Sequence, residues 1–454
     1  MSFSRRNFLV GGASLGGLLT LGATVGNPML ASAGDIVVAN PDRYFVFVYF
    51  FGGWDVILSL DPKDPGEYTQ ERLRDTGIEP GYETLVDEDL PSGYLIDTAV
   101  DGMTFGPYIG RLQRHAEKLC VMRGVAMDSV AHQVGQRHAN TGRKPAGVTV
   151  RGSSLATWFA SILGREETVP NLAVGIESFN VANPAWASGL STQSIDDLYD
   201  ALRPGRSGAG AAERDALDRF FAAEHERTKS NFERLSFDNR TYARDLVDQG
   251  LADLFNLRLG SAEMLGLRER FGVDSGVTGI AGPSALLAAQ ALTNGVSRCV
   301  TMRGANGLDS HSGDDWTQQH GPRQRAGFDA IAALIEHLQE TPYGDGSTWM
   351  DHTTIVVQSE FTRTPALNAS GGRDHHLSNS ALMLGAGIRG GQVIGASSDY
   401  KTGAQPIDFA TGKVDTSRDT FIHNENMAAT LFATLGVEGD PADLRAEPIQ
   451  AALS

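Results

Sequence analysis

Acidic and imidazole side chains stand directly after several apolar runs of this sequence, at positions where a metal-dependent site would need them. Asp55 follows the run 44–51, and Asp309 and His311 follow the run 298–303. Glu360 follows the run 353–358, and His375 comes shortly after it. Carboxylate oxygens and imidazole nitrogens are the protein ligands of divalent ions such as Zn²⁺ and Mn²⁺. The pattern predicts that these five side chains meet around one or two divalent ions, of which Zn, Mn, Mg and Ca all remain candidates.

Neighbouring residues extend this candidate site. His376 is an alternative to His375 as a ligand, and Arg363 and Arg373 suit the binding of an anionic substrate through paired hydrogen bonds. His132 opens an expected helix that ends at Thr141-Gly142. Exposed backbone amides at the start of that helix favour a bound anion. His132, Arg363 and Arg373 are therefore the catalytic candidates.

Taken singly, several of these residues have a structural alternative. Asp55 suits the cap of a turn, and Asp128 or Ser129 suits the N-cap of a helix. The pair Asp314-Asp315 suits a solvated surface. For Asp128 and Ser129 we favour the cap, whereas the five candidate ligands together favour a functional site.

The apolar runs alternate with helical patterns and define the fold that positions these residues. Runs typical of buried strands occupy 44–51, 118–125, 171–176, 298–303, 353–358 and 380–384, and helical spacing marks 284–291 and 329–338. The alternation predicts an α/β fold with a doubly wound, mainly parallel sheet flanked by helices. Such a sheet binds ligands at the carboxyl ends of its strands. We expect one domain over 34–454, with an all-helical insertion at about 195–271.

The N-terminus is typical of a twin-arginine signal peptide. Arg5 and Arg6 precede a moderately apolar, glycine-rich run that ends in Ala31-Ser32-Ala33. We expect cleavage after Ala33, export of the folded chain by the twin-arginine translocase, and a periplasmic or extracellular location. A short membrane helix is the alternative, but the glycines make a poor permanent anchor.

Composition excludes one class of function. The net charge is −17 and no Lys/Arg-rich block occurs, so nucleic-acid binding is not expected. The two cysteines, Cys120 and Cys299, lie in apolar runs and suit core thiols. They could form a disulfide only if their strands were neighbours.

Several motifs resemble a known family. Phe51-Gly52-Gly53-Trp54-Asp55, Asp309-Ser310-His311, the run from Glu360 to Pro365 and Gly372-Arg373-Asp374-His375 look like the signature of the bacterial family called domain of unknown function 1501. The resemblance covers essentially the whole mature chain. That family resembles the alkaline phosphatase and sulfatase superfamily, whose members hold one or two divalent metals at the strand ends and cleave phosphate or sulfate esters.

The resemblance implies roles for individual residues. Asp55 falls where the superfamily places its first-strand metal ligand, and Asp309 and His311 resemble its Asp and His ligands at a narrower spacing. Glu360 falls where an Asp-His pair is expected, with Phe361 in place of the His. His375 or His376 resembles the last His ligand.

The chain departs from the superfamily at the nucleophile. The superfamily places a Ser, Thr or modified Cys nine residues before a Thr-Gly, and here that position is His132. His132 could be a nucleophile or a ligand, and Ser129 is the fallback nucleophile. His138 lies off the face of His132 and suits a structural role. The sulfatase Cys/Ser-x-Pro-x-Arg motif is absent from the sequence.

Two functions remain open at this point. The first is a periplasmic metal-dependent hydrolase of a phosphate, sulfate or related anionic ester. The second is a catalytically silent metal-binding or assembly protein that keeps the alkaline phosphatase-like fold without the nucleophile. Fold analogy alone does not decide between them.

Overall fold

The computed structural model describes residues 36–203, 210–228 and 250–454. The expected signal peptide, residues 1–33, lies outside the described residues, and its assignment stays a prediction. In the described part of the chain no helix combines the length and the apolar character needed to cross a membrane.

The fold is built around β1 (Tyr44–Phe50), which is buried along its whole length. Its side chains alternate between two apolar clusters, with Val46 and Val48 on one face of the sheet and Phe45 and Phe47 on the other. Each large apolar side chain removed from water contributes about 1.5–3 kcal/mol to stability. Burial on both faces explains why this strand reads as a continuous apolar run instead of an alternating one.

The main sheet has eight strands in the order β12-β4-β11-β8-β1-β7-β5-β6. Seven of them run parallel, and β11 is antiparallel to both of its neighbours. The prediction of a large, mostly parallel sheet flanked by helices is confirmed. The strands are β1, β4 (Leu119–Ala126), β5 (Asn171–Val174), β6 (Leu190–Thr192), β7 (Cys299–Ala305), β8 (Thr353–Ser359), β11 (Ser378–Gly385) and β12 (Gln392–Ile394).

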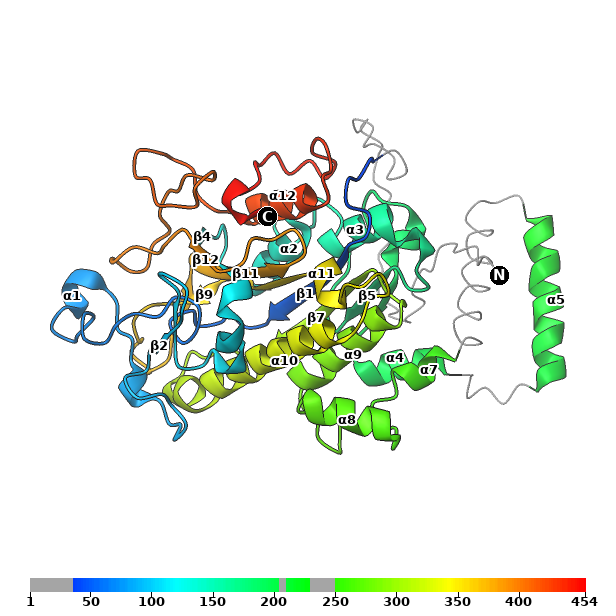
Figure 1. Ribbon diagram of the computed structural model, residues 1–454, viewed down its shortest axis with the longest axis horizontal. Coiled ribbons are helices and arrows are strands. Elements are labelled where there is room, and N and C mark those ends of the chain that lie inside the picture. Colours follow the sequence, from blue (N-terminus) through cyan, green and yellow to red (C-terminus); the bar gives the residue numbers. More distant parts are fainter. Residues whose placement is uncertain (1–35, 204–209, 229–249) are drawn as a thin grey trace.

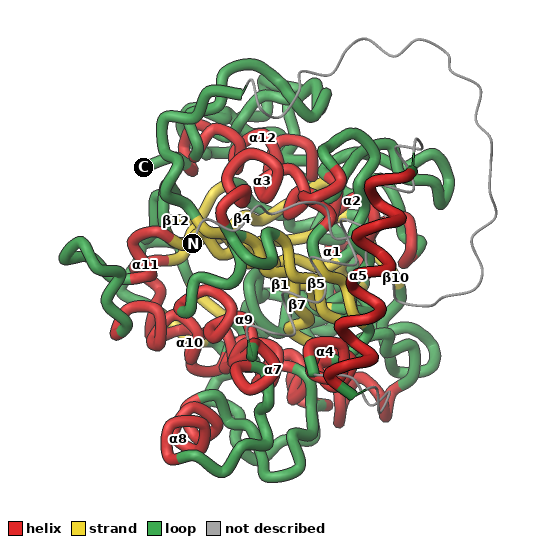
Figure 2. Tube along the Cα trace, turned by 90° about the vertical axis from the view of Figure 1, so that its right-hand side faces the viewer, coloured by secondary structure: helices red, strands yellow, loops and turns green. Residues whose placement is uncertain are grey.

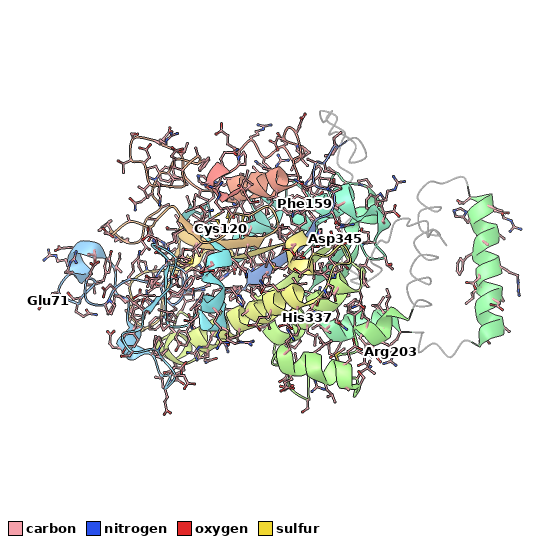
Figure 3. The ribbon with its side chains drawn as sticks, in the orientation of Figure 1. Glu71, Cys120, Phe159, Arg203, His337 and Asp345 are labelled. Atoms are coloured by element: carbon pink, nitrogen blue, oxygen red, sulfur yellow. The ribbon has the colours of Figure 1, made fainter. Side chains whose placement is uncertain are left out.

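Helices cover both faces of this sheet (Figures 1 and 2). The helices α9 and α10 pack on one face, and α2, α3 and α12 lie on the other. In Figure 3 the labelled side chains of Phe159 on α3 and His337 on α10 mark these two layers. The helices are α1 (Leu73–Thr76), α2 (His132–Thr141), α3 (Leu155–Leu163), α4 (Ile195–Leu202), α5 (Ala211–Arg227), α7 (Leu251–Leu254), α8 (Ala262–Arg270), α9 (Ala281–Thr293), α10 (Gly321–Glu340), α11 (Trp349–His352) and α12 (Asn424–Thr434).

The segment expected to be a helical insertion is helical where it is described. Between 195 and 271 the described residues form α4, α5, α7 and α8, and none of these described residues belongs to a strand. That the segment is an insertion into the domain stays a prediction.

The cysteines do not form a disulfide. Cys120 lies on β4 and Cys299 on β7, both are buried and free, and three strands separate them in the sheet. Burial raises the pKa of the Cys120 thiol to about 12, so this thiol stays protonated and unreactive.

Two short two-stranded ladders supplement the main sheet, and one of them serves the candidate site. β9 (Thr362–Arg363) pairs antiparallel with β10 (His375–His376) directly beyond the end of β8. The other joins β2 (Ile96–Asp97) and β3 (Thr104–Phe105). Successive strand residues point to opposite sides, so the first ladder separates the side chains of His375 and His376.

The start of α10 is fixed to the loop that follows β1. A wider helical turn over Asp315–His320 leads into α10. The backbone N–H of Asp55 donates to His320 Nε2 at 3.0 Å and to Gln324 Oε1 at 3.1 Å, while Gln324 Nε2 donates to the Asp55 carbonyl at 3.0 Å. His320 is fully buried, and its Nδ1 lies 2.7 Å from Ser310 Oγ. The interior therefore holds His320 as a neutral ring.

We predict that His320 makes the protein sensitive to acid. Burial lowers the pKa of His320 to about 4, while the unfolded chain has an ordinary histidine pKa of about 6.5. The unfolded state therefore takes up the proton first, and the free energy of unfolding falls by up to about 3 kcal/mol as the pH drops from about 6.5 to about 4. Urea unfolding across this range should show a shallower pH dependence for His320→Gln. Equal slopes for the variant and the wild type would contradict the assignment.

Candidate metal centre

Three imidazole rings converge on the carboxylate of Asp309 at the carboxyl edge of the sheet. The Nε2 atoms of His311, His132 and His375 lie 3.0, 3.3 and 3.3 Å from Asp309 Oδ1. His311 Nε2 and His375 Nε2 are 3.1 Å apart. His132, Asp309 and His375 also offer ligand atoms that all lie within 4.8 Å of one another. The structure therefore brings together four of the sequence-predicted residues, with Arg363 against Asp309 and Glu360 against His132.

The other nitrogen of each ring faces an acceptor. His375 Nδ1 lies 2.7 Å from the Val130 carbonyl oxygen, which can only accept a hydrogen bond. His311 Nδ1 lies 2.8 Å from Asp374 Oδ1, and His132 Nδ1 lies 2.8 Å from Glu360 Oε1. These partners place the proton on Nδ1 and leave the Nε2 lone pair directed at the cluster, as in histidines that bind metals.

The spacing of these atoms suits a bound cation. In a tetrahedral zinc site with ligands at about 2.0–2.1 Å, neighbouring ligand atoms are about 3.3 Å apart. Four of the six distances between these atoms are 3.0–3.3 Å and so lie close to that edge length, while the ligand atoms that all lie within 4.8 Å of one another belong to His132, Asp309 and His375. Two unprotonated Nε2 atoms repel at 3.1 Å, and a cation beside them would offset that repulsion. In addition, His132 Nε2 is buried and has no hydrogen-bond partner.

Glu360 fixes the orientation of the His132 ring through a contact with its Nδ1 atom. Its side chain is buried, and Oε1 accepts hydrogen bonds from the Gly52 amide at 2.9 Å and from Gln136 Nε2 at 3.2 Å, besides the contact with His132. Gly52 has a φ of +109°, and a Cβ there would lie 2.5 Å from the Asp309 nitrogen. A Cβ at Gly135 on α2 would lie 2.5 Å from the Glu360 carbonyl oxygen. Both glycines permit the close backbone approaches that bring the ligands together.

Phe361 forms an apolar wall beside the rings. It is fully buried, and its ring centroid lies 4.8 Å from that of His132 and 4.4 Å from that of His375. This residue restricts the tilt of both imidazoles.

Arg363 lies beneath Asp309. Its side chain is buried, Nε donates to the Gly53 carbonyl at 2.9 Å, and Nη2 donates to Asp309 Oδ1 at 2.6 Å. Nη2 also donates to the Gly52 carbonyl. The guanidinium holds Asp309 in position, and its Nη1 also lies 3.4 Å from His311 Nε2.

Asp55 and Arg373 form a buried pair away from the cluster. Arg373 Nε lies 3.2 Å from Asp55 Oδ2, and both side chains are buried. Asp55 Oδ2 also accepts from Trp316 Nε1 at 2.8 Å, and Oδ1 accepts from the Ile57 amide at 3.0 Å. Arg373 Nη1 and Nη2 donate to backbone carbonyls, and its guanidinium lies over the Trp316 ring. Asp55 is therefore assigned to the support of the site and not to its ligands, and Arg373 is not placed to clamp an anion.

His376, Ser129 and His138 also lie outside the cluster. His376 Nδ1 accepts from the Ser378 amide at 3.1 Å, on the opposite side of β10 from His375. Ser129 Oγ accepts from the Ala131 amide at 3.0 Å and shapes the turn before α2. His138 is buried, with Nε2 at 2.8 Å from Glu425 Oε1. Asp128, near that pair, lies 3.5 Å from Lys144 Nζ.

Sequence reasoning did not identify two contributors. Asp374 holds His311, and the backbone carbonyl of Val130 holds His375. Asp374 stands between Arg373 and His375 in the motif Gly372-Arg373-Asp374-His375, so its position in the sequence indicates a role at the site. A backbone carbonyl leaves no such signal in a sequence.

Neighbouring groups and burial shift the pKa values of the residues at the centre in different directions. Burial alone would raise the pKa of Asp309, but the hydrogen bond and the positive charge of Arg363 hold that pKa well below its usual range. The hydrogen bond with Glu360 raises the pKa of His132, whereas burial lowers the pKa of His375. Asp309 is thus an anion at neutral pH. Its side chain is 48% exposed, so a solvent-borne ligand can reach it.

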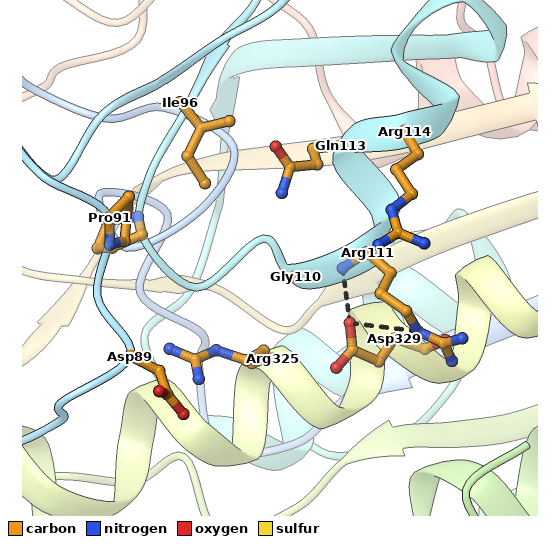
Figure 4. A pocket seen from close by; sticks show the side chains of 10 residues that line it. Asp89, Pro91, Ile96, Gly110, Arg111, Gln113, Arg114, Arg325 and Asp329 are labelled. Carbon is orange, nitrogen blue, oxygen red and sulfur yellow. Dashed lines mark hydrogen bonds and ion pairs between the residues drawn. The ribbon is translucent and has the colours of Figure 1, made fainter.

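A separate cavity lies between Gly110–Lys118 and α10 (Figure 4). It has a volume of 320 Å³ and shares no lining residue with the candidate centre. Among its arginines, Arg325 pairs with Asp87 at 3.0 Å, and Arg111 lies 3.9 Å from Asp329 and Glu336. Its charges are largely balanced.

The chain belongs to the family described as protein of unknown function (DUF1501), whose model matches residues 42–442. No curated protein sequence matches the chain.

Solved structures with a similar arrangement include Ps i-CgsB, at 9% identity and a TM-score of 0.39, with 90% of this chain and 75% of that chain covered. They also include the alkaline phosphatase of the Antarctic bacterium TAB5, at 9% identity and a TM-score of 0.28, with 76% and 91% covered. The alkaline phosphatase of Thermus thermophilus has 13% identity and a TM-score of 0.25, with 76% and 64% covered. At these TM-scores the likeness carries no argument about function.

Asp55→Asn distinguishes a supporting carboxylate from a ligand. We predict that it lowers the free energy of unfolding by about 3–5 kcal/mol, because Arg373 would be left as an uncompensated buried charge. Under native conditions the folded variant should keep the metal content of the wild type. Urea unfolding and elemental analysis measure the two quantities. Loss of metal from a variant of unchanged stability would instead make Asp55 a ligand.

Proposed function

We propose that this protein is an exported, metal-dependent hydrolase of a phosphate, sulfate or related anionic ester. The convergence of three Nε2 atoms on Asp309, each ring with its Nδ1 facing an acceptor, carries the proposal. The sequence-based signal peptide supports a periplasmic or extracellular location, because Arg5 and Arg6 stand at its start.

The ligand set favours zinc. His132, His311 and His375 would supply three nitrogen ligands and Asp309 one oxygen ligand. Imidazole nitrogen suits Zn²⁺, whereas Mg²⁺ and Ca²⁺ prefer sites made of oxygen alone. Mn²⁺ is the next candidate.

We infer that the centre holds one ion. A second ion would need further carboxylates, and the described candidates are already engaged, Asp374 with His311. Asp55 is paired with Arg373 and Trp316, and Glu360 accepts hydrogen bonds from His132, Gly52 and Gln136. Removing either carboxylate from its partners would leave buried groups unpaired.

The chain supplies positioning and charge at this centre. When bound, a divalent ion supplies Lewis acidity toward an ester oxygen. Glu360, Asp374 and the Val130 carbonyl fix the orientation of the rings. Arg363 fixes Asp309 from the buried side, and Phe361 excludes water from beneath His132 and His375.

We assign His132 to the ligand set in preference to the nucleophile. A nucleophilic imidazole needs an Nε2 that is open to the substrate, but here Nε2 is buried and directed at Asp309. The hydrogen bond from Nδ1 to Glu360 is typical of a metal-bound histidine.

A catalytically silent metal protein is the second candidate. One observation favours it, because His132 stands where the resemblance implies a hydroxyl or thiol nucleophile. Hydrolysis of generic phosphate and sulfate esters by the metal-loaded protein separates the two proposals.

The neighbouring histidines of β10 provide a matched test. We predict that His375→Ala lowers zinc occupancy and ester hydrolysis at least about tenfold, because an open coordination position weakens the site. His376→Ala should keep both values near wild type, because that ring contacts Ser378 instead. Elemental analysis and a 4-nitrophenyl phosphate and sulfate assay measure the outcome.

Metal-loaded wild type that hydrolyses neither ester would favour the silent protein. Equal metal occupancy in His375→Ala and wild type would overturn the proposed ligand set.

A further inference from the structure

The two arginines that the sequence offered as anion clamps are buried. Arg363 is directed at Asp309 and the backbone, and Arg373 is paired with Asp55. A substrate anion therefore needs another cation at this edge of the sheet. Arg303, near the end of β7, is a guanidinium that no described carboxylate pairs.

We propose that Arg303 forms a second anion-binding subsite, so that the substrate carries another negative group in addition to the ester bound at the metal centre. This inference rests on the proposed function and narrows its substrate class to dianionic or polyanionic esters. The second group would be a carboxylate, sulfate or phosphate.

The contacts of Arg303 leave part of its guanidinium group available for an anion. Its Nε donates to the Gly175 carbonyl at 2.6 Å, and the guanidinium carbon lies 5.4 Å from the centroid of the Phe51 ring. Across the described residues, no carboxylate lies within ion-pair distance of Arg303. Its side chain is half-buried. One hydrogen bond and the face of an aromatic ring thus fix the guanidinium. No described carboxylate accepts a hydrogen bond from its terminal nitrogens.

Such a cation is costly to keep without a partner. Burial lowers the pKa of Arg303, which reflects the loss of water around the charge. An anion accepting two parallel hydrogen bonds from the fork would offset that loss. The chain as a whole carries a net charge of −17, so acids for pairing are plentiful in the sequence.

Two other arginines show the contrast. Arg137 on α2 donates to both carboxylate oxygens of Glu177, at 2.8 and 2.7 Å. In the separate cavity, Arg325 is paired with Asp87. Arg303 differs from both of them in having only a carbonyl partner.

A short series of contacts connects Arg303 to the metal centre. Phe51, under the guanidinium, is followed by Gly52, whose amide donates to Glu360. Glu360 in turn holds His132. Alternation along β7 places Arg303 on the same face of the sheet as Cys299, which is the face covered by α2 and α3. The subsite therefore lies on the α2 side of the sheet, toward the strand ends that carry the centre.

The test uses alkane bisphosphonates of graded chain length, with monophosphonates of matched length as controls. Neither ligand is hydrolysed, so equilibrium binding by calorimetry needs no turnover. In zinc-loaded wild type, one chain length should bind about tenfold more tightly than its monophosphonate control, as expected for one charge-assisted contact. In Arg303→Gln that gain should disappear, with monophosphonate affinity unchanged.

Two further variants complete the experiment. Arg303→Lys should keep part of the gain, because it retains the charge without the fork. Arg270→Gln removes an ion pair with Glu340, at the far end of α10, and should keep the whole gain.

The outcomes separate the two proposals. An equal gain in Arg303→Gln and wild type, or no gain at any chain length in a protein that binds monophosphonate, overturns the subsite and leaves the metal centre intact. A chain that takes up no zinc overturns the proposed function. In that case the subsite is tested by bisphosphonate binding to the zinc-free protein. Binding should be weaker in Arg303→Gln than in the wild type, and equal binding in the two proteins overturns the subsite.

Discussion

The contact between each Nδ1 and a fixed acceptor is the interaction on which this site depends. His375 is held by a backbone carbonyl at the turn before α2, His132 by a buried glutamate after β8, and His311 by Asp374. These acceptors come from different segments of the chain. They direct the three Nε2 atoms toward Asp309, because the sheet brings the ends of its strands together. Without them the rings would rotate freely, and an exposed cluster of histidines would be a weak ligand set.

A buried layer of charges lies beneath the rings and keeps the acceptors in place. Arg363 contacts Asp309 and the glycines after β1, and Arg373 contacts Asp55. The two arginines are adjacent in space, since Arg363 Nη1 donates to the Arg373 carbonyl at 3.1 Å. Buried charges of this kind contribute little net stability when paired and cost much when one partner is removed. Their value here is geometric, because they fix the loops that carry the ligands.

The sequence predicts the large elements well and the side-chain directions poorly. The apolar run of β1 and the helical spacing of α10 follow from burial, because the order of apolar residues along the sequence reflects which side chains are buried. Asp55 and His376 were reasonable ligands by position, since both follow strands at the correct edge. Their directions depend on partners distant in the sequence, such as Trp316 and Arg373 for Asp55, and on the pleat of β10 for His376. The short strands β6 and β12 were missed because three residues carry too little pattern. The contribution of the Val130 carbonyl was invisible for a simpler reason, because every residue has one.

The coordination of cobalt tests the account most directly. Metal-free protein titrated with Co²⁺ should develop the intense visible absorption of a four- or five-coordinate site and saturate at one equivalent per chain. X-ray absorption at the metal edge should then show imidazole nitrogens together with oxygen. Saturation at two equivalents, a pale octahedral spectrum with oxygen ligands alone, or no uptake would contradict a single centre built from His132, Asp309, His311 and His375.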